Sequence, residues 1–270
     1  HKVIDPLFLD ELQEEFETIQ AYKTLDIKRK RLMDFQEKLA HLKFLDPACG
    51  SGNFLTETYL SLRRLENKVL QVLFGEGQGV LRIAASDIIK VPIQQFYGIE
   101  INDFAVTVAK TALWIAESQM LEETKNIIYG LDGDFLPLKT YVNITEDNAL
   151  RIDWNDVISA DELNYIMGNP PFVGYAYQSK EQKEDLIQIT LDMGKVGKNI
   201  DYVAGWYFKA SKFMANSLIK TAFVSTNSIT QGEQVSAVWQ PMYKFFNIHI
   251  DFAYRTFRWD SEANLKAHVH

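Results

Sequence analysis

The chain has 270 residues, 47% of them hydrophobic and 24% charged, and a formal net charge of −8 at pH 7. This composition is typical of a globular protein, and the length suffices for one large α/β domain with a smaller appendage. Its single cysteine, Cys49, excludes an intrachain disulfide and a cysteine-rich metal site, and the lack of a long apolar run excludes a spanning helix, so we expect a cytoplasmic protein.

The negative net charge argues against tight nucleic-acid binding by this chain alone, because a domain that binds phosphates usually has an excess of Lys and Arg over Asp and Glu. The basic cluster at residues 28–31 is better explained as the solvated face of a helix than as a phosphate clamp. If the protein binds nucleic acid, it therefore needs either a locally basic cleft in an otherwise acidic domain or a nucleic-acid-binding region that lies elsewhere.

Residues 5–42 have no glycine and are rich in Glu, Lys, Leu and Gln, with apolar residues at helical spacing, which predicts two helices. A short apolar strand is predicted at residues 44–46, and a glycine-rich turn follows it. Apolar residues then recur at helical spacing from Leu55 to Leu73. Strand, glycine turn and helix are the first half of a βαβ unit.

The alternation of strands and helices continues to the end of the chain. After a loop with glycines at 75–79 and a helical stretch to Ile89, we expect a strand at 96–100 and then a helix. That helix is marked by the apolar residues Phe104, Val108, Ala112 and Ile115. Further strands are predicted near residues 142–144, 165–167, 222–224 and 248–254. This order predicts an α/β fold with a doubly wound, mostly parallel sheet and a helical N-terminal extension.

The turn after the first strand, Asp46-Pro47-Ala48-Cys49-Gly50-Ser51-Gly52, has the features of a ligand-binding loop. Glycines between a strand and a helix let the backbone approach a ligand, and α/β sheets bind nucleotides at the carboxyl ends of their strands. Glu100 ends the next strand, where a carboxylate can accept hydrogen bonds from both ribose hydroxyls. Because residues 74–92 intervene, its spacing from the turn argues against a plain dehydrogenase.

The most specific signal is Asn169-Pro170-Pro171-Phe172, directly after the strand predicted at 165–167. Two prolines fix an extended loop at the ligand-binding edge of the sheet, and Pro170 keeps its carbonyl acceptor although it has no N–H. The side-chain oxygen of Asn169 and the Pro170 carbonyl can present two acceptors to one amino group, and Phe172 can offer a flat face to an aromatic ring.

These two loops resemble motifs I and IV of class I amino-methyltransferases that act on DNA. Related enzymes that methylate protein glutamine or ribosomal RNA share the second loop but usually open with a different glycine loop. The resemblance implies S-adenosylmethionine as cofactor and no metal in this domain. It implies a cofactor site formed by Asp46, Pro47, Ala48, Cys49, Gly50, Gly52, Asn53, Phe54, Glu100, Ile101, Asn148, Ala149 and Asn169. It also implies a catalytic loop formed by Asn169, Pro170, Pro171 and Phe172.

A narrower resemblance covers most of the chain. Residues 4–9, 148–154, 201–206 and 231–234 are similar to the methyltransferase region of MmeI-like (type IIL) restriction–modification enzymes, in which a nuclease domain precedes this region and a target-recognition domain follows it. We therefore expect a fragment, with residues 1–43 as a helical extension that includes the tail of motif X. Residues 44–270 would be the catalytic domain, truncated where residues 267–270 begin the last strand of the sheet.

Two positions remain open for contacts with adenine rings. The residue that contacts the adenine of the cofactor is either Asn148 or Asp134, and Asn148 is preferred because the segment after it matches the family. A second aromatic side chain, Trp259 or Phe257, could close the other face of the methylated base, although each could equally belong to the core.

The expected activity is methyl transfer from S-adenosylmethionine to N6 of an adenine flipped out of double-stranded DNA, as part of a restriction–modification protein. Two acceptors would stabilise the charge that develops on the amine, and alignment would supply much of the remaining rate. Because the sulfonium leaves as a neutral thioether, no metal is required. The alternatives are methylation of cytosine N4, an RNA base or a protein glutamine, a dinucleotide-dependent oxidoreductase, and a non-catalytic cofactor-binding module. DNA is expected to bind through the full-length protein, which would leave the fragment inactive or non-specific.

Overall fold

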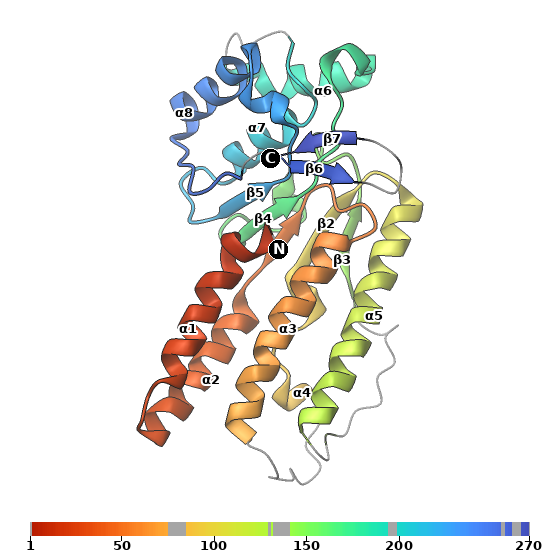
Figure 1. The fold of residues 1–270 in the computed structure, drawn as a ribbon. Helices are drawn as coiled ribbons and strands as arrows, with labels where there is room; N and C mark the ends of the chain where they lie inside the picture. The colour runs from red at the N-terminus through yellow and green to blue at the C-terminus, as the bar shows by residue number, and fades with distance from the viewer. Residues whose placement is uncertain are drawn as a thin grey trace.

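The computed structural model describes residues 2–74, 85–128, 131, 141–193 and 199–254, and the backbone of 257–260 and 266–269. Figure 1 shows a central sheet with the long helices α1, α2, α3 and α5 extending from one side of it and α6, α7 and α8 on the other. Within the described ranges, no helix combines the length and the apolar character that crossing a membrane requires.

The main sheet has five strands, and all of its neighbouring strands are parallel. Its strands are β1 (Phe44–Asp46), β2 (Phe96–Glu100), β3 (Asn143–Glu146), β4 (Tyr165–Gly168) and β5 (Lys220–Phe223), in the order β3-β2-β1-β4-β5. This arrangement confirms the predicted parallel α/β fold. Because the chain winds outward in both directions from β1, the carboxyl ends of β1 and β4 flank the position where such sheets bind ligands.

The helices follow the predicted alternation. They are α1 (Asp10–Gln20), α2 (Leu25–His41), α3 (Asn53–Phe74), α4 (Ala85–Ile88), α5 (Asp103–Ile127), α6 (Lys180–Thr190), α7 (Ala204–Phe213) and α8 (Gln240–Phe246). Shorter helical turns are η1 (Asp5–Leu9), η2 (Ile93–Gln95), η4 (Trp154–Asp156), η5 (Tyr175–Tyr177), η6 (Leu191–Met193), η7 (Asn227–Thr230) and η8 (Val235–Trp239). The two helices expected in residues 5–42 are confirmed as α1 and α2, with η1 leading into α1.

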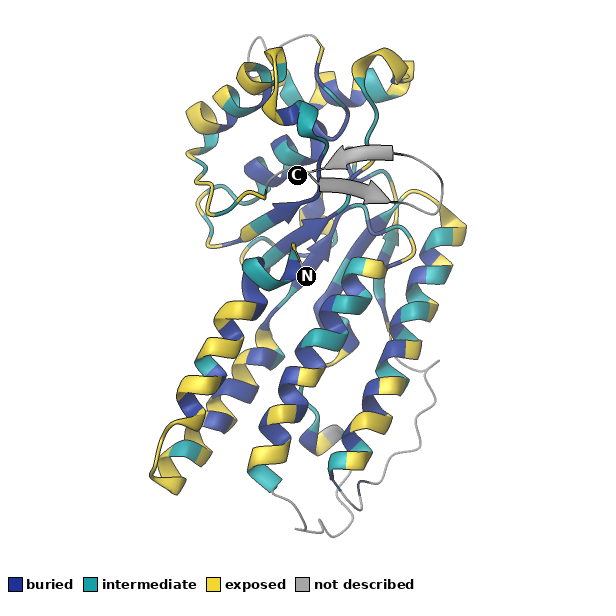
Figure 2. Cartoon of the chain, in the orientation of Figure 1, coloured by how far each residue is buried: buried dark blue, intermediate teal, exposed yellow. Residues whose placement is uncertain are grey.

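Two apolar clusters cover the two faces of the sheet, because successive side chains of a strand point to opposite faces. Phe44 and Phe96 stack at 5.1 Å in the cluster that α1, α2, α3 and α5 complete. Leu45 and Ile99 lie in the second cluster, with α6, α7 and α8. Figure 2 shows the buried residues concentrated along the sheet and on the inner faces of these helices. The predicted boundary at residue 43 stays a prediction, although α1 and α2 share the first cluster with α3.

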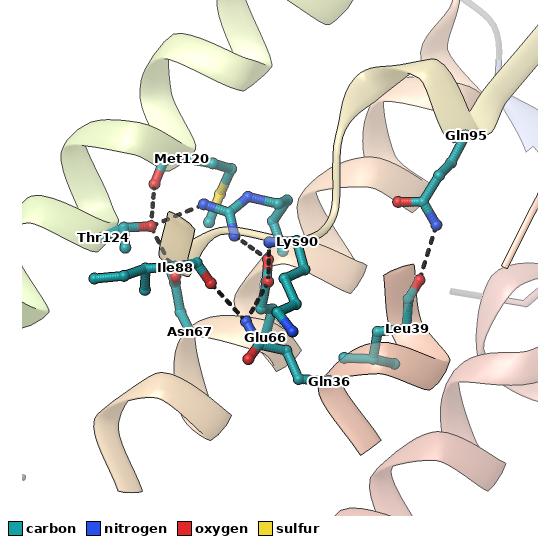
Figure 3. Close-up of polar contacts among 10 residues, drawn as sticks. Gln36, Leu39, Glu66, Asn67, Ile88, Lys90, Gln95, Met120 and Thr124 are labelled. Carbon is teal, nitrogen blue, oxygen red and sulfur yellow. Dashed lines mark hydrogen bonds and ion pairs between the residues drawn. The ribbon is translucent and has the colours of Figure 1, made fainter. Parts of the chain in front are cut away.

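A buried polar network joins α2, α3 and α5 on the sheet face that carries Phe44 and Phe96. Arg63 and Glu66 form an ion pair whose side chains are 1% and 0% exposed. Glu66 also accepts hydrogen bonds from the Gln36 side chain at 2.7 Å and from the backbone N–H of Lys90 at 2.6 Å, and Arg63 donates to Thr124 at 2.9 Å. Figure 3 shows these groups pointing toward one another from α2, α3, α5 and the segment before β2. The network therefore ties four parts of the chain together beneath the sheet.

The apolar face expected for the helix after β2 was wrong, although the helix itself is confirmed as α5. Phe104 and Ile115 are 74% and 53% exposed, whereas the buried residues of the helix include Val106, Ala109 and Leu113. Both sets recur at helical spacing. The choice between them depends on which face packs against α3, and a pattern that is apolar on two faces does not specify it.

The strand predicted at 248–254 is also wrong, because these residues are not part of any strand. Asn247 ends α8 in the left-handed conformation (φ 49°), and the segment after it packs Ile248 against one cluster and Phe252 against the other. The apolar pattern was real, but the segment gains no neighbouring strand for its backbone.

The last two strands form a separate pair. They are β6 (Phe257–Asp260) and β7 (Lys266–Val269), which are antiparallel to each other. The expectation that residues 267–270 begin the last strand of the main sheet is therefore wrong, since β7 hydrogen-bonds to β6 in a two-stranded sheet. Strand pairing is decided by tertiary contacts, which the apolar residues of a short segment do not encode.

Candidate functional site

The glycine turn between β1 and α3 adopts a conformation that other residues rarely take. Gly50 and Gly52 have φ values of +52° and +83°, where a side chain would cause strain. A Cβ on Gly52 would also lie 3.0 Å from the Cβ of Ala109, so α5 packs directly against the turn. The Gly52 N–H donates to the carbonyl of Cys49 at 2.8 Å. The turn is therefore fixed, and its backbone lies close to the carboxyl end of β1.

Glu100, at the end of β2, lies beside this turn as predicted. One of its carboxylate oxygens accepts from the backbone N–H of Gly50 at 2.9 Å, and the other accepts from that of Asn102 at 2.9 Å. Each oxygen can accept a further hydrogen bond, so the carboxylate can be held by the protein and still receive two hydroxyl groups. The next residue, Ile101, is 67% exposed and offers an apolar surface beside the carboxylate.

Asp46, the last residue of the central strand β1, is a buried carboxylate at the edge formed by the carboxyl ends of the parallel strands. It is 1% exposed, and one oxygen accepts from the Ala48 N–H at 3.0 Å. A Cβ on Gly168 would lie 2.5 Å from that oxygen, so only glycine at the end of β4 leaves room for it. Burial raises the pKa of Asp46 to about 7, and the negative charge of Glu100 adds to this effect. Among the described residues no cationic side chain pairs with Asp46, so a ligand's positive group would be stabilised there.

Cys49 belongs to the core beneath the turn. It is 5% exposed, its N–H donates to the carbonyl of Ile99 at 3.1 Å, and burial raises the pKa of its thiol. A Cβ on Gly98 would lie 2.8 Å from its sulfur. Asn53 and Phe54, which begin α3, are exposed and half-buried. Cys49 would thus support the turn from within the core, and Asn53 and Phe54 follow the turn at the start of α3.

Asn148 follows β3 and lies at the same edge, because the adjacent Asp147 donates its N–H to the carbonyl of Glu100 at 3.0 Å. The Asn148 side-chain amide donates to Asp185 at 3.1 Å, and its oxygen accepts from the Leu150 N–H at 2.9 Å. Its neighbour Ala149 is buried. The alternative candidate Asp134 lies outside the described residues.

Asp185 holds this part of the site, which the sequence pattern did not reveal. This α6 residue is 6% exposed and accepts hydrogen bonds from Asn148, from Arg151 at 2.7 Å and from the Tyr202 hydroxyl at 3.2 Å. Burial raises the pKa of Tyr202, and the negative charge of Asp185 and its hydrogen bond to the hydroxyl raise that pKa further. Three donors on one carboxylate fix the loop after β3 against the segment that precedes α7.

The loop after β4 carries the predicted acceptors. The Asn169 side-chain oxygen is buried and has no hydrogen-bond partner among the described residues. Pro170 is buried, Pro171 is exposed and Phe172 is half-buried. A buried amide oxygen without a donor is costly, which is typical of a group that meets its partner only when a ligand binds.

Two contacts fix this loop relative to the glycine turn. The carbonyl of Val173 accepts from the backbone N–H of Tyr202 at 2.9 Å, and the Trp206 indole N–H donates to the carbonyl of Pro47 at 2.9 Å. Tyr202 and Trp206 are themselves in edge-on contact at 5.2 Å. The start of α7 therefore contacts both loops of the site.

A cavity of about 290 Å³ opens beside Phe172. Its lining is Phe172, Val173, Gly174, Asp201, Thr226, Asn227 and Ser228. The volume is near the lower end of the roughly 300–1,000 Å³ typical of ligand pockets. Sequence reasoning missed the polar part of this lining. Residues 226–228 come just after β5, and this position after the carboxyl end of a parallel strand could have indicated that they line the site. The side chains of Phe257 and Trp259 lie outside the described residues.

Comparisons with known proteins agree with the fold described above. The family model described as "MmeI, DNA-methyltransferase domain" matches residues 21–270. DNA methyltransferase A of Bacillus subtilis (strain 168) is 45% identical over 275 residues, which are 99% of this chain and 29% of that protein. A putative type II restriction enzyme and methyltransferase of Methanocaldococcus jannaschii is 30% identical over 118 residues, 42% of this chain and 9% of that protein.

Two solved structures share the fold. The type IIL restriction–modification enzyme MmeI in complex with DNA matches with a TM-score of 0.88 and 44% identity, over 98% of this chain and 34% of that chain. A nuclease-deletion mutant of the type ISP enzyme LlaGI matches with a TM-score of 0.52 and 18% identity, over 90% and 19% of the two chains, which supports the fold alone. This chain thus spans about a third of these relatives or less. The resemblance stated from the sequence is confirmed, and the chain belongs to the family of MmeI DNA-methyltransferase domains.

Proposed function

We propose that this chain is the catalytic region of a DNA methyltransferase that transfers a methyl group from S-adenosylmethionine to N6 of adenine, within a restriction–modification protein. The observation that carries the proposal is the buried side-chain oxygen of Asn169, which has no hydrogen-bond partner in the part of the chain that the structure describes. Asn169 lies directly after β4, which pairs with β1, and it precedes Phe172 of the cavity lining on the same loop. An amino group would complete its hydrogen bonding.

The residues along the sheet edge fit S-adenosylmethionine. Glu100 would accept from the ribose hydroxyls, with Ile101 against the adenine and Asn148 beside it. The buried carboxylate of Asp46 would stabilise the positively charged methionine end, for which the described residues supply no competing cation. The cofactor, when bound, supplies an electrophilic methyl group on a sulfonium. The glycine turn leaves its backbone accessible for this ligand, and Asn53 and Phe54 would border it.

Asn169 and Pro170 would activate the amine. The lone pair of an exocyclic amine is delocalised into the ring, so the nitrogen is a poor nucleophile. Two fixed acceptors, the Asn169 oxygen and the Pro170 carbonyl, would draw electron density onto it and stabilise the positive charge that arrives with the methyl group. Pro171 would keep the loop extended, since its ring fixes the backbone. Alignment of the nitrogen with the methyl group would supply much of the remaining rate.

Phe172 would hold the base after it leaves the duplex. A paired base cannot reach a loop recessed at the edge of a sheet, so the adenine has to be flipped out. The ring of Phe172 lines the cavity and is half-buried, which suits it to stacking against one face of the base. Double-stranded DNA is thus the proposed partner, bound through the intact protein because the net charge of −8 offers little general attraction for phosphates.

The family favours DNA over the other planar amines that Asn169 and Pro170 could activate. Its description names DNA-methyltransferase domains, which argues against an RNA base or a protein glutamine. The unpartnered acceptor on the Asn169 loop has no role in a dinucleotide-dependent oxidoreductase.

Replacement of Asn169 tests the proposal. In the intact protein, Asn169→Ala should reduce the single-turnover rate of adenine methylation by about 10²–10³, because one preorganised acceptor is lost. Affinity for S-adenosylmethionine should stay nearly unchanged, since Glu100 and Asp46 remain. Asn126→Ala, at an exposed position of α5, is the matched control and should leave both quantities as in the wild type. A folded Asn169→Ala protein that methylates at the wild-type rate would rule out the acceptor role.

A further inference from the structure

A chain of hydrogen-bonded side chains forms one wall of the cavity beside Phe172. Ser228 donates from its hydroxyl to one carboxylate oxygen of Asp201, and the hydroxyls of Thr226 and Ser228 lie 2.6 Å apart. All three residues line the cavity. Thr226 and Ser228 come from the segment after β5, and Asp201 precedes α7, so the wall joins two elements that the sequence separates.

The direction of these hydrogen bonds follows from the chemistry of the groups. A carboxylate only accepts hydrogen bonds, and a hydroxyl has one proton to donate. Ser228 uses its proton on Asp201, so at its contact with Thr226 it has to accept, and Thr226 uses its own proton on Ser228. All hydroxyl protons of the wall therefore point toward Asp201. What these three side chains retain for a ligand is lone pairs.

The wall is fixed relative to the loop that carries Phe172. The Asp201 N–H donates to the side chain of Gln234 at 3.1 Å. A Cβ on Gly174 would lie 3.7 Å from the second carboxylate oxygen of Asp201, so that oxygen borders the backbone just after Phe172. The next residue, Tyr202, donates its N–H to the carbonyl of Val173. A base stacked on Phe172 would thus meet the wall at a defined distance.

We propose that the wall formed by Asp201, Ser228 and Thr226 selects the methylated base by excluding bases that carry a carbonyl group; this inference rests on the proposed function. Asn169 and Pro170 would recognise an amine, which both adenine and cytosine have. Adenine, however, is the only common DNA base without a carbonyl oxygen. A carbonyl placed against the lone pairs of these three side chains loses its bound water and gains no donor from the wall, which is costly. Asn227, in the same cavity, has amide donors for ring nitrogens.

Asp201→Asn tests the inference, because the amide of asparagine can donate where the carboxylate only accepts. Donation from this amide to Ser228 would reverse the chain, so that Ser228 donates to Thr226 and the Thr226 proton becomes available to the cavity. The intact protein is given duplexes that contain its own site, identified from methylated positions in cells that express it, with either adenine or cytosine at the target position. The ratio of cytosine to adenine methylation, measured by mass spectrometry of the nucleosides after single-turnover reactions, should rise about 10-fold.

Ser228→Ala provides a second variant if Asp201→Asn does not fold. It interrupts the chain and frees the Thr226 proton, so the same ratio should rise, by a smaller factor. Asp161→Asn, at an exposed position, is the matched control and should keep the wild-type ratio.

The outcomes separate the inference from the proposed function. Folded Asp201→Asn and Ser228→Ala proteins that keep the wild-type ratio would overturn the inference alone. If only Ser228→Ala folds, its ratio decides. A wild-type protein that binds the duplex and the cofactor and methylates no adenine would overturn the proposed function, and the inference with it.

Discussion

Two regions of this molecule bury polar side chains, and they differ in how many hydrogen bonds the protein supplies to those side chains. In the network beneath the sheet, Glu66 accepts from Arg63, Gln36 and the backbone of Lys90, so its charge is matched within the fold. At the carboxyl edge of the sheet Asp46 is equally buried, yet within the described part of the chain it accepts only from the backbone N–H of Ala48, and the Asn169 oxygen has no partner there.

Pairing alone does not separate these groups, because Arg63 Nε and Asn67 Nδ2 of the network also lack a hydrogen-bond partner among the described residues. What distinguishes Asp46 and Asn169 is their position at the carboxyl ends of parallel strands, where α/β sheets bind ligands. A buried charge that is paired internally stabilises one arrangement of the helices, and removing its partner is costly. A buried acceptor that stays unpaired lowers stability, and at the carboxyl edge of the sheet a bound ligand can complete its hydrogen bonding. Substitutions in the network should therefore affect unfolding, whereas substitutions at the edge should affect binding and chemistry.

Glu66→Gln should have the largest effect on stability. It leaves the Arg63 guanidinium buried without its counter-charge, which typically costs about 3–5 kcal/mol. Urea denaturation should report the loss, while cofactor affinity measured at a temperature where the variant is folded should not change. Glu123→Gln, which removes the exposed partner of Arg64, serves as the control and should cost about 0–1 kcal/mol. Equal losses in the two variants would contradict the structural role of the network.

Glu100→Ala should show the opposite pattern. It removes the acceptors for the ribose hydroxyls, each worth about 1.5–3 kcal/mol when the acceptor is charged, so affinity for S-adenosylmethionine should fall by at least about 10-fold. Isothermal titration calorimetry measures this change. Glu100→Gln, which keeps one acceptor oxygen, should lose less. Unchanged affinity in a folded Glu100→Ala protein would remove this residue from the cofactor site.

The pH dependence of stability should identify Asp46. Because burial raises its pKa to about 7, the folded protein retains a proton that the unfolded chain has released at any pH between about 4 and 7. Stability from this group is therefore greatest at low pH and falls as pH rises, by about 1.4 kcal/mol per pH unit in that window.

Asp46→Asn should remove this contribution. Unfolding free energies measured between pH 4 and 8 should show a weaker loss toward neutral pH in the variant than in the wild type, with Asp161→Asn as the exposed control. Parallel profiles for wild type and Asp46→Asn would show that the carboxylate has found a compensating positive group.

Asp185→Asn should have the smallest effect of the four. Its amide would face the donors of Asn148 and Tyr202, so the loop after β3 should lose its fixed position. Because Asp185 acts through Asn148, affinity for the cofactor should fall by about 10-fold. Calorimetry checks this, with the exposed neighbour Glu184→Gln as control. A variant that binds the cofactor as tightly as the wild type would assign Asp185 to stability alone.

Much of the fold could be predicted because it depends on local patterns. The strands β1 and β2 have the predicted bounds, since short apolar segments next to glycines specify buried parallel strands. The helix after β2 was correctly placed, but its buried face was not, because Phe104 and Val106 are equally apolar and only packing against α3 distinguishes them. The strand predicted at 248–254 was wrong for a related reason, because a strand needs a neighbouring strand to pair with, and the apolar pattern does not specify one.

The sequence by itself determined the two loops of the site. Glycines that tolerate positive φ and prolines that fix an extended backbone act through local sterics, so the glycine turn and the Asn169 loop could be recognised from the residues alone. The tertiary structure alone decided which groups surround them. Asp185 and the wall of Asp201, Ser228 and Thr226 come from segments far apart in the chain, and their hydrogen bonds form only when parallel strands bring these segments to one edge.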